Sequence, residues 1–157
     1  MANLRRAGVA DGAALVHLRA MVLSVLSAMG SDPAADGWAR ACEEAFARRL
    51  AEPDRFAAWV VDVDGSPVAS GVGWVEEHLP SPSEPDGRRG HIASMSTDLA
   101  HRRQGHAQAV LDALLRWFAE AGVLRVDQRA TPDGRGLYQR AGFREVGGAA
   151  LSRVSPR

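Results

Sequence analysis

The sequence contains no lysine, because all nineteen basic residues in its 157 positions are arginine. A lysine general base or a Schiff-base lysine is therefore excluded. Any basic side chain that binds a phosphate must do so with a planar guanidinium, which can bind bidentately. Nineteen acidic residues balance the arginines, so the formal net charge is zero. This balance gives no reason to expect nucleic acid or a membrane surface as a partner.

Cysteine is nearly as scarce, and Cys42 stands alone. A single cysteine cannot form an intrachain disulfide, so we expect a cytoplasmic protein. Cys42 lies in a helical pattern, where a small buried apolar role is expected. Long apolar runs are also missing, since residues 20–29 are too few to span a bilayer. The N-terminus lacks the basic-then-apolar layout of a signal peptide.

The pattern of apolar residues predicts one mixed α/β domain over residues 1–157. Helices are expected from the N-cap Asp11 along an apolar stripe to Met29, and at residues 38–50, 104–121 and 133–141. A loop is expected at residues 30–36. Strands are expected at residues 3–9, 56–63, 68–76, 91–97, 124–130, 143–146 and 150–154.

Three features of the expected sheet depend on glycine and proline. Asp64-Gly65 predicts a type I′ hairpin turn, which needs positive φ at both residues. Gly71 and Gly73 weaken their strand and indicate a bulge or a close approach by another group. Residues 79–90 hold three prolines and predict a mobile surface loop, which is either a functional lid or disordered.

The chemistry is concentrated where strand 91–97 leads through a basic turn into helix 104–121. A helix N-terminus presents free N–H groups and a partial positive charge. Gly105 allows close approach to the backbone, and Ala107 keeps the next position small. Arg102 and Arg103 are mildly unfavourable there, by about 0.3–1 kcal/mol, unless an anion is present. The turn therefore predicts a phosphate or pyrophosphate site rather than a merely solvated basic face.

Two segments carry a resemblance to a known family. The spacing Arg102-x-x-Gly105-x-Ala107 resembles the R/Q-x-x-G-x-G/A signature of the GNAT superfamily of acyl-CoA-dependent N-acetyltransferases. Residues 137–143, Leu-Tyr-Gln-Arg-Ala-Gly-Phe, resemble that family's L-Y-x-x-x-G-F segment. The resemblance implies a mixed, mostly antiparallel sheet with a splayed parallel strand pair, flanked by about four helices. A Walker A motif and a G-x-G-x-x-G motif after the first strand are both absent.

The resemblance also implies acetyl-CoA as acyl donor, without a metal. The CoA pyrophosphate would lie on the turn, and the pantetheine arm would pair with the end of strand 91–97. Tyr138 would lie near the sulfur and protonate the departing thiolate, although it could instead be a core aromatic residue. The implied cofactor-binding residues are Met95, Ser96, Thr97, Arg102, Arg103, Gln104, Gly105, His106, Ala107, Gln108 and Tyr138.

The base and the acceptor are less constrained by the sequence. Glu76 and Glu77 end the strand beside 91–97 and are candidate general bases, although two acids there also fit a solvated strand end. His91 and His101 are further candidates. We expect transfer to a primary amine of a small molecule, with a polyamine, an aminoglycoside-like compound, an amino acid or a protein N-terminus open. Alternatives are a silent CoA-binding sensor of the same fold and a module for another phosphate. The family commonly forms dimers, so a homodimer is possible.

Overall fold

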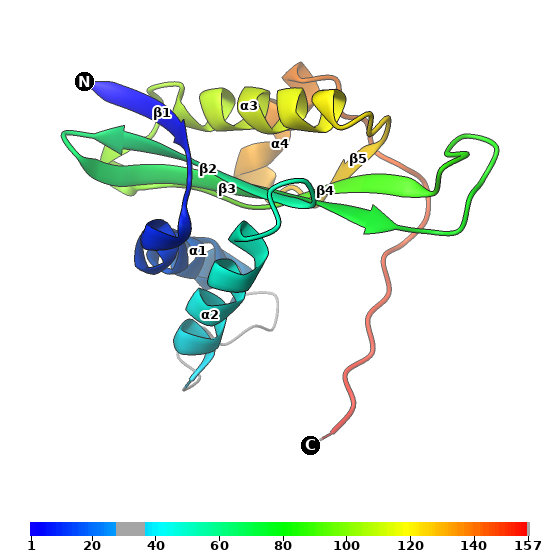
Figure 1. Cartoon of the computed structure of the whole chain (residues 1–157), viewed down its shortest axis with the longest axis horizontal. Coiled ribbons are helices and arrows are strands. Elements are labelled where there is room, and N and C mark those ends of the chain that lie inside the picture. Colours follow the sequence, from blue (N-terminus) through cyan, green and yellow to red (C-terminus); the bar gives the residue numbers. More distant parts are fainter. Residues whose placement is uncertain (28–36, 157) are drawn as a thin grey trace.

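Five strands of the described residues form one sheet in chain order, β1-β2-β3-β4-β5 (Figure 1). The structure, a computed structural model, describes residues 1–27 and 37–156. The first three pairs of neighbours are antiparallel, and β4 with β5 is parallel. The predicted mixed, mostly antiparallel sheet is therefore confirmed. In order, the strands are Ala2–Arg6, Phe56–Val63, Ser66–Glu77, Arg88–Thr97 and Val126–Gln128.

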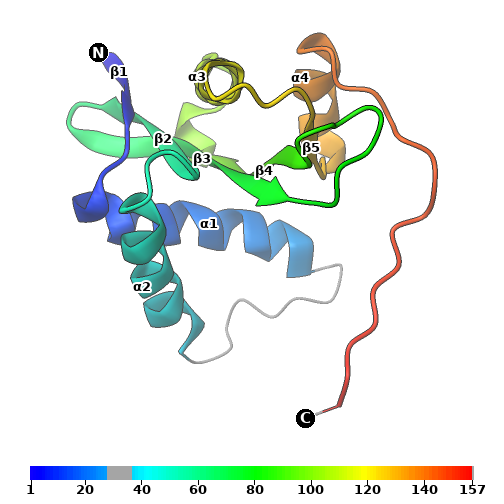
Figure 2. The same cartoon turned by 45° about the vertical axis from the view of Figure 1, so that its right-hand side comes forward.

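Two helices cover each face of the sheet (Figure 2). Helices α1 (Gly12–Ser27) and α2 (Trp38–Leu50) lie on one face, and α3 (His106–Glu120) and α4 (Arg135–Arg140) lie on the other. Each face buries its own apolar cluster. Cys42 is half-buried on α2, and burial raises the pKa of its thiol. No helix within the described part of the chain is long and apolar enough to cross a membrane.

The start of α1 differs from the prediction. Asp11 ends a 3-10 turn, Val9–Asp11, and its carboxylate accepts from the Gly8 N–H at 2.8 Å, so it is not the N-cap of α1. The Arg5 guanidinium donates to both Asp11 oxygens, at 2.8 and 2.9 Å, and holds the pKa of that carboxyl below its usual range. Met29 and residues 30–36, which carry the rest of the predicted stripe and loop, lie outside the described residues.

Both predictions about the β-hairpins can be compared with the structure. Asp64 and Gly65 have φ of 50° and 81°, which confirms the turn with two positive φ values. Residues 78–87 connect β3 and β4 and are tied together by hydrogen bonds, whereas residues 88–90, expected in the loop, begin β4. His78 N–H donates to Gly87 O at 2.7 Å. The buried Glu84 carboxylate accepts from Arg89 at 2.6 and 2.9 Å, which anchors the loop to β4.

Helix α3 packs on the sheet where the sheet lacks side chains. A Cβ added at Gly73 would lie 2.9 Å from Phe118 Cζ, and one at Gly90 would lie 2.6 Å from Phe118 Cε1. The β3–β4 register shifts between Ser70 and Val72, at Gly71. The bulge and the close approach expected near Gly71 and Gly73 are therefore both confirmed, and the close approach lets α3 bury the Phe118 ring.

The predicted strands at 143–146 and 150–154 are wrong, because residues 144–156 have no regular structure and extend away from the body (Figure 1). Val146, Leu151 and Val154 are 71%, 91% and 89% exposed. Gly147-Gly148 and the following alanines have low strand propensity, which favours this outcome. The strand expected at 124–130 is also shorter, since it pairs with β4 only over Val126–Gln128.

We expect Gly90→Ala to lower the free energy of unfolding by about 1–3 kcal/mol, because its Cβ would collide with the buried Phe118 ring. Gly8→Ala is the matched control, since nothing lies within 4 Å of its added Cβ. Urea unfolding of both variants measures the difference. Equal stability of the two variants would contradict the proposed close packing, and Phe118→Leu should relieve part of the loss.

Candidate functional site

The parallel strands β4 and β5 separate after three residue pairs, of which the last is Ile92 with Gln128. Strand β5 ends there, while β4 continues for five more residues to Thr97. Beyond Ile92, the edge of β4 that faces β5 therefore has no strand partner within the described residues, although its other edge pairs with β3. The predicted splayed pair is confirmed, and Met95, Ser96 and Thr97 lie on its free edge.

The free edge of β4 leads directly into a turn with two left-handed residues. Asp98 Oδ1 accepts from the Ala100 N–H at 3.0 Å and begins a 3-10 turn, Leu99–His101. Arg102 Nε donates to Thr97 O at 3.2 Å, which closes the turn on the end of β4. Arg103 has φ of 63°, and Gly105, the N-cap of α3, has φ of 82°.

The N-terminus of α3 is open and uncapped. Its first helical bond joins Ala109 N–H to Gly105 O at 3.0 Å, so the N–H groups of residues 106–108 precede that bond. No side chain in the described part of the chain caps the helix, and none of its atoms lies within 4 Å of a Cβ built at Gly105. The first turn of α3 contains no acidic residue. Arg102, Arg103 and Gln104 are exposed around it. This arrangement fits a pyrophosphate, which would satisfy the free N–H groups.

Two predicted binding residues turn their side chains elsewhere. The Gln108 amide donates to Asp112 at 2.8 Å along the helix. The His106 imidazole is 8% exposed, and its Nε2 has no hydrogen-bond partner among the described residues. Helix α3 also begins at His106 rather than at residue 104, so Gln104 and Gly105 belong to the turn. The contribution predicted for His106 and Gln108 therefore rests on their backbone N–H groups.

Tyr138 lies on α4 within the same apolar cluster as Ile92, the β4 residue at the point of separation, and Val126, which begins β5. Its ring is 6% exposed and meets Phe143 edge-on, with centroids 5.5 Å apart. Burial raises the pKa of Tyr138 to about 12, so the phenol keeps its proton at neutral pH. Tyr138 is thus a core aromatic residue with a protonated phenol, and its role in catalysis stays a prediction.

On the opposite face, three rings form a row across the sheet. Phe56, Trp74 and His91 are direct cross-strand partners on β2, β3 and β4. The Phe56 and Trp74 centroids lie 6.5 Å apart, and those of Trp74 and His91 lie 4.6 Å apart. We call these three residues the aromatic row. His91 ends the row beside Asp127 on β5, one residue before the strands separate.

Glu76 lies two residues from Trp74 and therefore on the same face. Its carboxylate accepts from Trp74 Nε1 at 3.0 Å and lies 2.9 Å from His78 Nε2. The hydrogen bond with His78, then that with Trp74, lowers the pKa of Glu76 against the opposing effect of burial. About a third of its side chain is exposed, at 36%. Glu76 is therefore an ionised carboxylate with access to solvent.

Glu77 points to the other face, because adjacent strand residues alternate. It is 72% exposed and pairs with Arg55 at 3.1 Å. The two adjacent acids that the sequence could not distinguish thus have different surroundings.

His101 lies in the turn after β4, where its Nδ1 is buried without a partner among the described residues.

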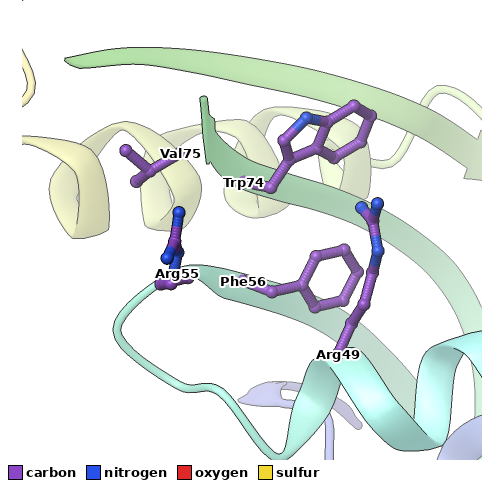
Figure 3. A pocket seen from close by; sticks show the side chains of 5 residues that line it. All are labelled: Arg49, Arg55, Phe56, Trp74 and Val75. Carbon is purple, nitrogen blue, oxygen red and sulfur yellow. The ribbon is translucent and has the colours of Figure 1, made fainter. Parts of the chain in front are cut away.

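An open surface pocket of about 180 Å³, which we call the cavity, lies at the β2 end of the aromatic row (Figure 3). Nothing in the sequence alone predicts it. The missing signal was long-range register, since Phe56 and Trp74 become neighbours only when β2 and β3 pair. Among the described residues, no group of three potential ligand side chains could hold a metal ion. The residues that line the cavity are Arg49, Arg55, Phe56, Trp74 and Val75.

A family model described as acetyltransferase (GNAT) family matches residues 23–143, most of the chain. The protein belongs to the GNAT acetyltransferase family. The splayed strands, the open turn and α3 all lie within the matched region. Among curated proteins, none matches the chain in sequence.

Solved structures share the GNAT fold along the whole chain. One is a GCN5-related N-acetyltransferase from Ralstonia eutropha JMP134, with 26% identity, a TM-score of 0.81, and coverage of 98% of this chain and 99% of that one. Another is a predicted acetyltransferase with acetyl-CoA from Clostridium acetobutylicum, with 24% identity, a TM-score of 0.86, and coverage of 98% and 96%. An aminoglycoside acetyltransferase from an uncultured soil metagenomic sample has 20% identity, a TM-score of 0.73, and coverage of 99% of each chain.

We expect His78→Ala to raise the pKa of Glu76 toward its ordinary value, because the largest stabilising contact of the carboxylate is lost. Carboxyl ¹³C chemical shifts of glutamate, followed by NMR from about pH 3 to 7, measure the pKa. His17→Ala is the control, since His17 is exposed on α1. An unchanged Glu76 pKa in His78→Ala would contradict the contact.

Proposed function

We propose that the protein transfers an acetyl group from acetyl-CoA to a primary amine of a small-molecule acceptor by direct attack. The observation that carries this proposal is the continuous path from the unpaired edge of β4 to the uncapped, arginine-flanked N-terminus of α3. Unpaired backbone groups and free helix N–H groups both need partners. A ligand with an amide-bearing arm and a pyrophosphate supplies partners for both.

The turn residues divide the binding of CoA between backbone and side chain. The N–H groups of residues 103–108 would hold the pyrophosphate, with Arg102 and Arg103 adding charge. Met95, Ser96 and Thr97 would offer backbone groups to the pantetheine arm along the free edge. The bound donor would supply an acetyl thioester, and along this path its thioester end would lie toward Ile92, where the strands separate. The acetyl-CoA complex of a protein with this fold supports the donor.

Among the candidate bases, Glu76 has the surroundings that the reaction needs. It is ionised, so it attracts the ammonium form of an acceptor, and it lies on the face that carries His91. Its hydrogen bond to the exposed His78 gives the amine proton a route to water. Glu77 lacks this role because Arg55 already pairs with it on the other face. We therefore assign the base to Glu76, with His91 beside it.

Tyr138 is the proposed acid. Its raised pKa keeps the phenol protonated, so it can donate to the sulfur that departs as the amide bond forms. Its place in the cluster around Ile92 and Val126 supports a position near the thioester. A silent CoA-binding domain would need neither this donor nor a solvent-accessible Glu76, and no observation favours that alternative.

We expect Glu76→Gln to lower kcat by about 10²–10⁴-fold and Tyr138→Phe by about 10²-fold, since each variant removes one proton-transfer group. The affinity for CoA should stay the same in Glu76→Gln. Release of free CoA thiol with a panel of amines measures turnover, and calorimetry measures CoA affinity. A larger loss in Glu77→Gln than in Glu76→Gln would reverse the assignment of the base.

We expect Gly105→Ala to weaken CoA binding, because its Cβ would enter the open cradle at the start of α3 and strain a φ of 82°. Gly122→Ala is the matched control at the other end of the helix, where φ is 72° and the space is equally open. Both variants should lose about 1 kcal/mol of stability. Equal CoA affinity in the two variants would contradict the proposal that the pyrophosphate binds at this turn.

A further inference from the structure

Arg49 has an unusual position for a helix-end arginine. It lies in the last turn of α2 and reaches over two members of the aromatic row (Figure 3). Its guanidinium carbon lies 5.6 Å from the centre of the Phe56 ring and 5.4 Å from that of Trp74. Aromatic faces attract a guanidinium but leave its N–H edge free to bind an anion. The guanidinium of this exposed arginine therefore contacts both rings and keeps its donors available.

The charges around the cavity leave Arg49 without a counter-ion. Arg55, the other cation that lines the cavity, pairs with Glu77 at 3.1 Å. Arg49 has no carboxylate within ion-pair distance among residues 1–27 and 37–156. The cavity wall thus carries one uncompensated positive charge on an aromatic floor, which favours a carboxylate or phosphate bound by a bidentate guanidinium.

Trp74 connects this cation with the proposed base. Its indole Nε1–H donates to the Glu76 carboxylate at 3.0 Å. Its cross-strand neighbour on β4 is His91, and the centroids of the two rings lie 4.6 Å apart. The Arg49 guanidinium lies 5.4 Å from the Trp74 centroid, and the His91 ring lies 4.6 Å from it. The distance between the guanidinium and the His91 ring therefore cannot exceed the sum of these two distances. A chain of several bonds can span that separation.

We infer that the acceptor is a small amine with an anionic group several bonds away, whose anion binds Arg49 and whose amine lies at Glu76 and His91. This inference rests on the proposed acetyl transfer and names its substrate class. The flat aromatic row between the two charges suits an aliphatic linker, which would pack on the rings. Arg49, together with Arg19, which donates to Ser94 of β4 on the same face, disfavours polycationic acceptors.

The test compares three acceptors of similar length in the full-length protein: 5-aminopentanoate, 4-aminobutyl phosphate and pentan-1-amine. We expect the anionic acceptors to exceed pentan-1-amine in kcat/KM on the order of 10- to 100-fold, which is the effect of one charge-assisted contact. The larger of the two anionic values identifies carboxylate or phosphate as the preferred group. In Arg49→Gln the ratio should fall toward one, and in Arg49→Lys it should be intermediate.

Arg48→Gln is the matched control, because Arg48 is an exposed arginine of the same helical turn that does not line the cavity. It should keep the ratio of the unaltered protein, and thermal unfolding checks that both variants are folded. A ratio near one in the unaltered protein, or one that Arg49→Gln leaves unchanged, overturns the inference while leaving acetyl transfer intact.

A direct binding measurement separates this inference from the proposed function. Calorimetric titration of 5-aminopentanoate and 4-aminobutyl phosphate into the CoA-saturated protein needs no turnover. If no amine is acetylated, the proposed function fails, and Arg49-dependent binding of either compound still supports the anion site. Absence of binding by both compounds, or binding that Arg49→Gln does not weaken, overturns the anion site.

Discussion

One unmet hydrogen-bonding requirement organises the molecule: beyond Ile92, no strand of the described residues pairs with the outer edge of β4. Backbone N–H and C=O groups that lose water without gaining a partner cost about 1–3 kcal/mol each. Such an edge is stable only if water hydrates it or if a ligand from outside the chain supplies hydrogen-bond partners. The turn that follows offers a second set of unpaired N–H groups at the start of α3. The two sets together form one extended surface that a single long ligand can satisfy.

The sheet separates two environments with different chemistry. On the α3 side, glycines at 71, 73 and 90 allow Phe118 and its neighbours to pack directly on the backbone. This contact holds the C-terminal part of α3 against the start of β4. On the α1 side, the same strands carry the aromatic row, Glu76 and the Arg49 cavity. A reaction centre at the point of strand separation would therefore have access to a dry, protonated phenol from one side and an ionised carboxylate from the other.

The sequence predicted the features that depend on local chemistry. The helix start near residue 104 and the hairpin at Asp64-Gly65 follow from charge and φ requirements of a few adjacent residues. Features that depend on strand register could not be predicted in this way. Alternation along the strand puts Glu76 and Glu77 on opposite faces, but only the pairing of β3 with its neighbours shows which face each residue takes. Residues 143–154 show the reverse error, since apolar side chains alone suggested strands that have no pairing partner.

The cations around the proposed site have a chemical consequence beyond binding. Arg102 and Arg103 flank the N-terminus of α3, where we propose that CoA binds, and a guanidinium stays protonated and non-nucleophilic at neutral pH. A lysine at either of these positions would be a primary amine within reach of the acyl donor. The chain thus surrounds amine-directed chemistry with positive charge while presenting no side-chain amine of its own. If the acceptor is a primary amine, as we propose, the chain offers the acyl donor no competing lysine side chain.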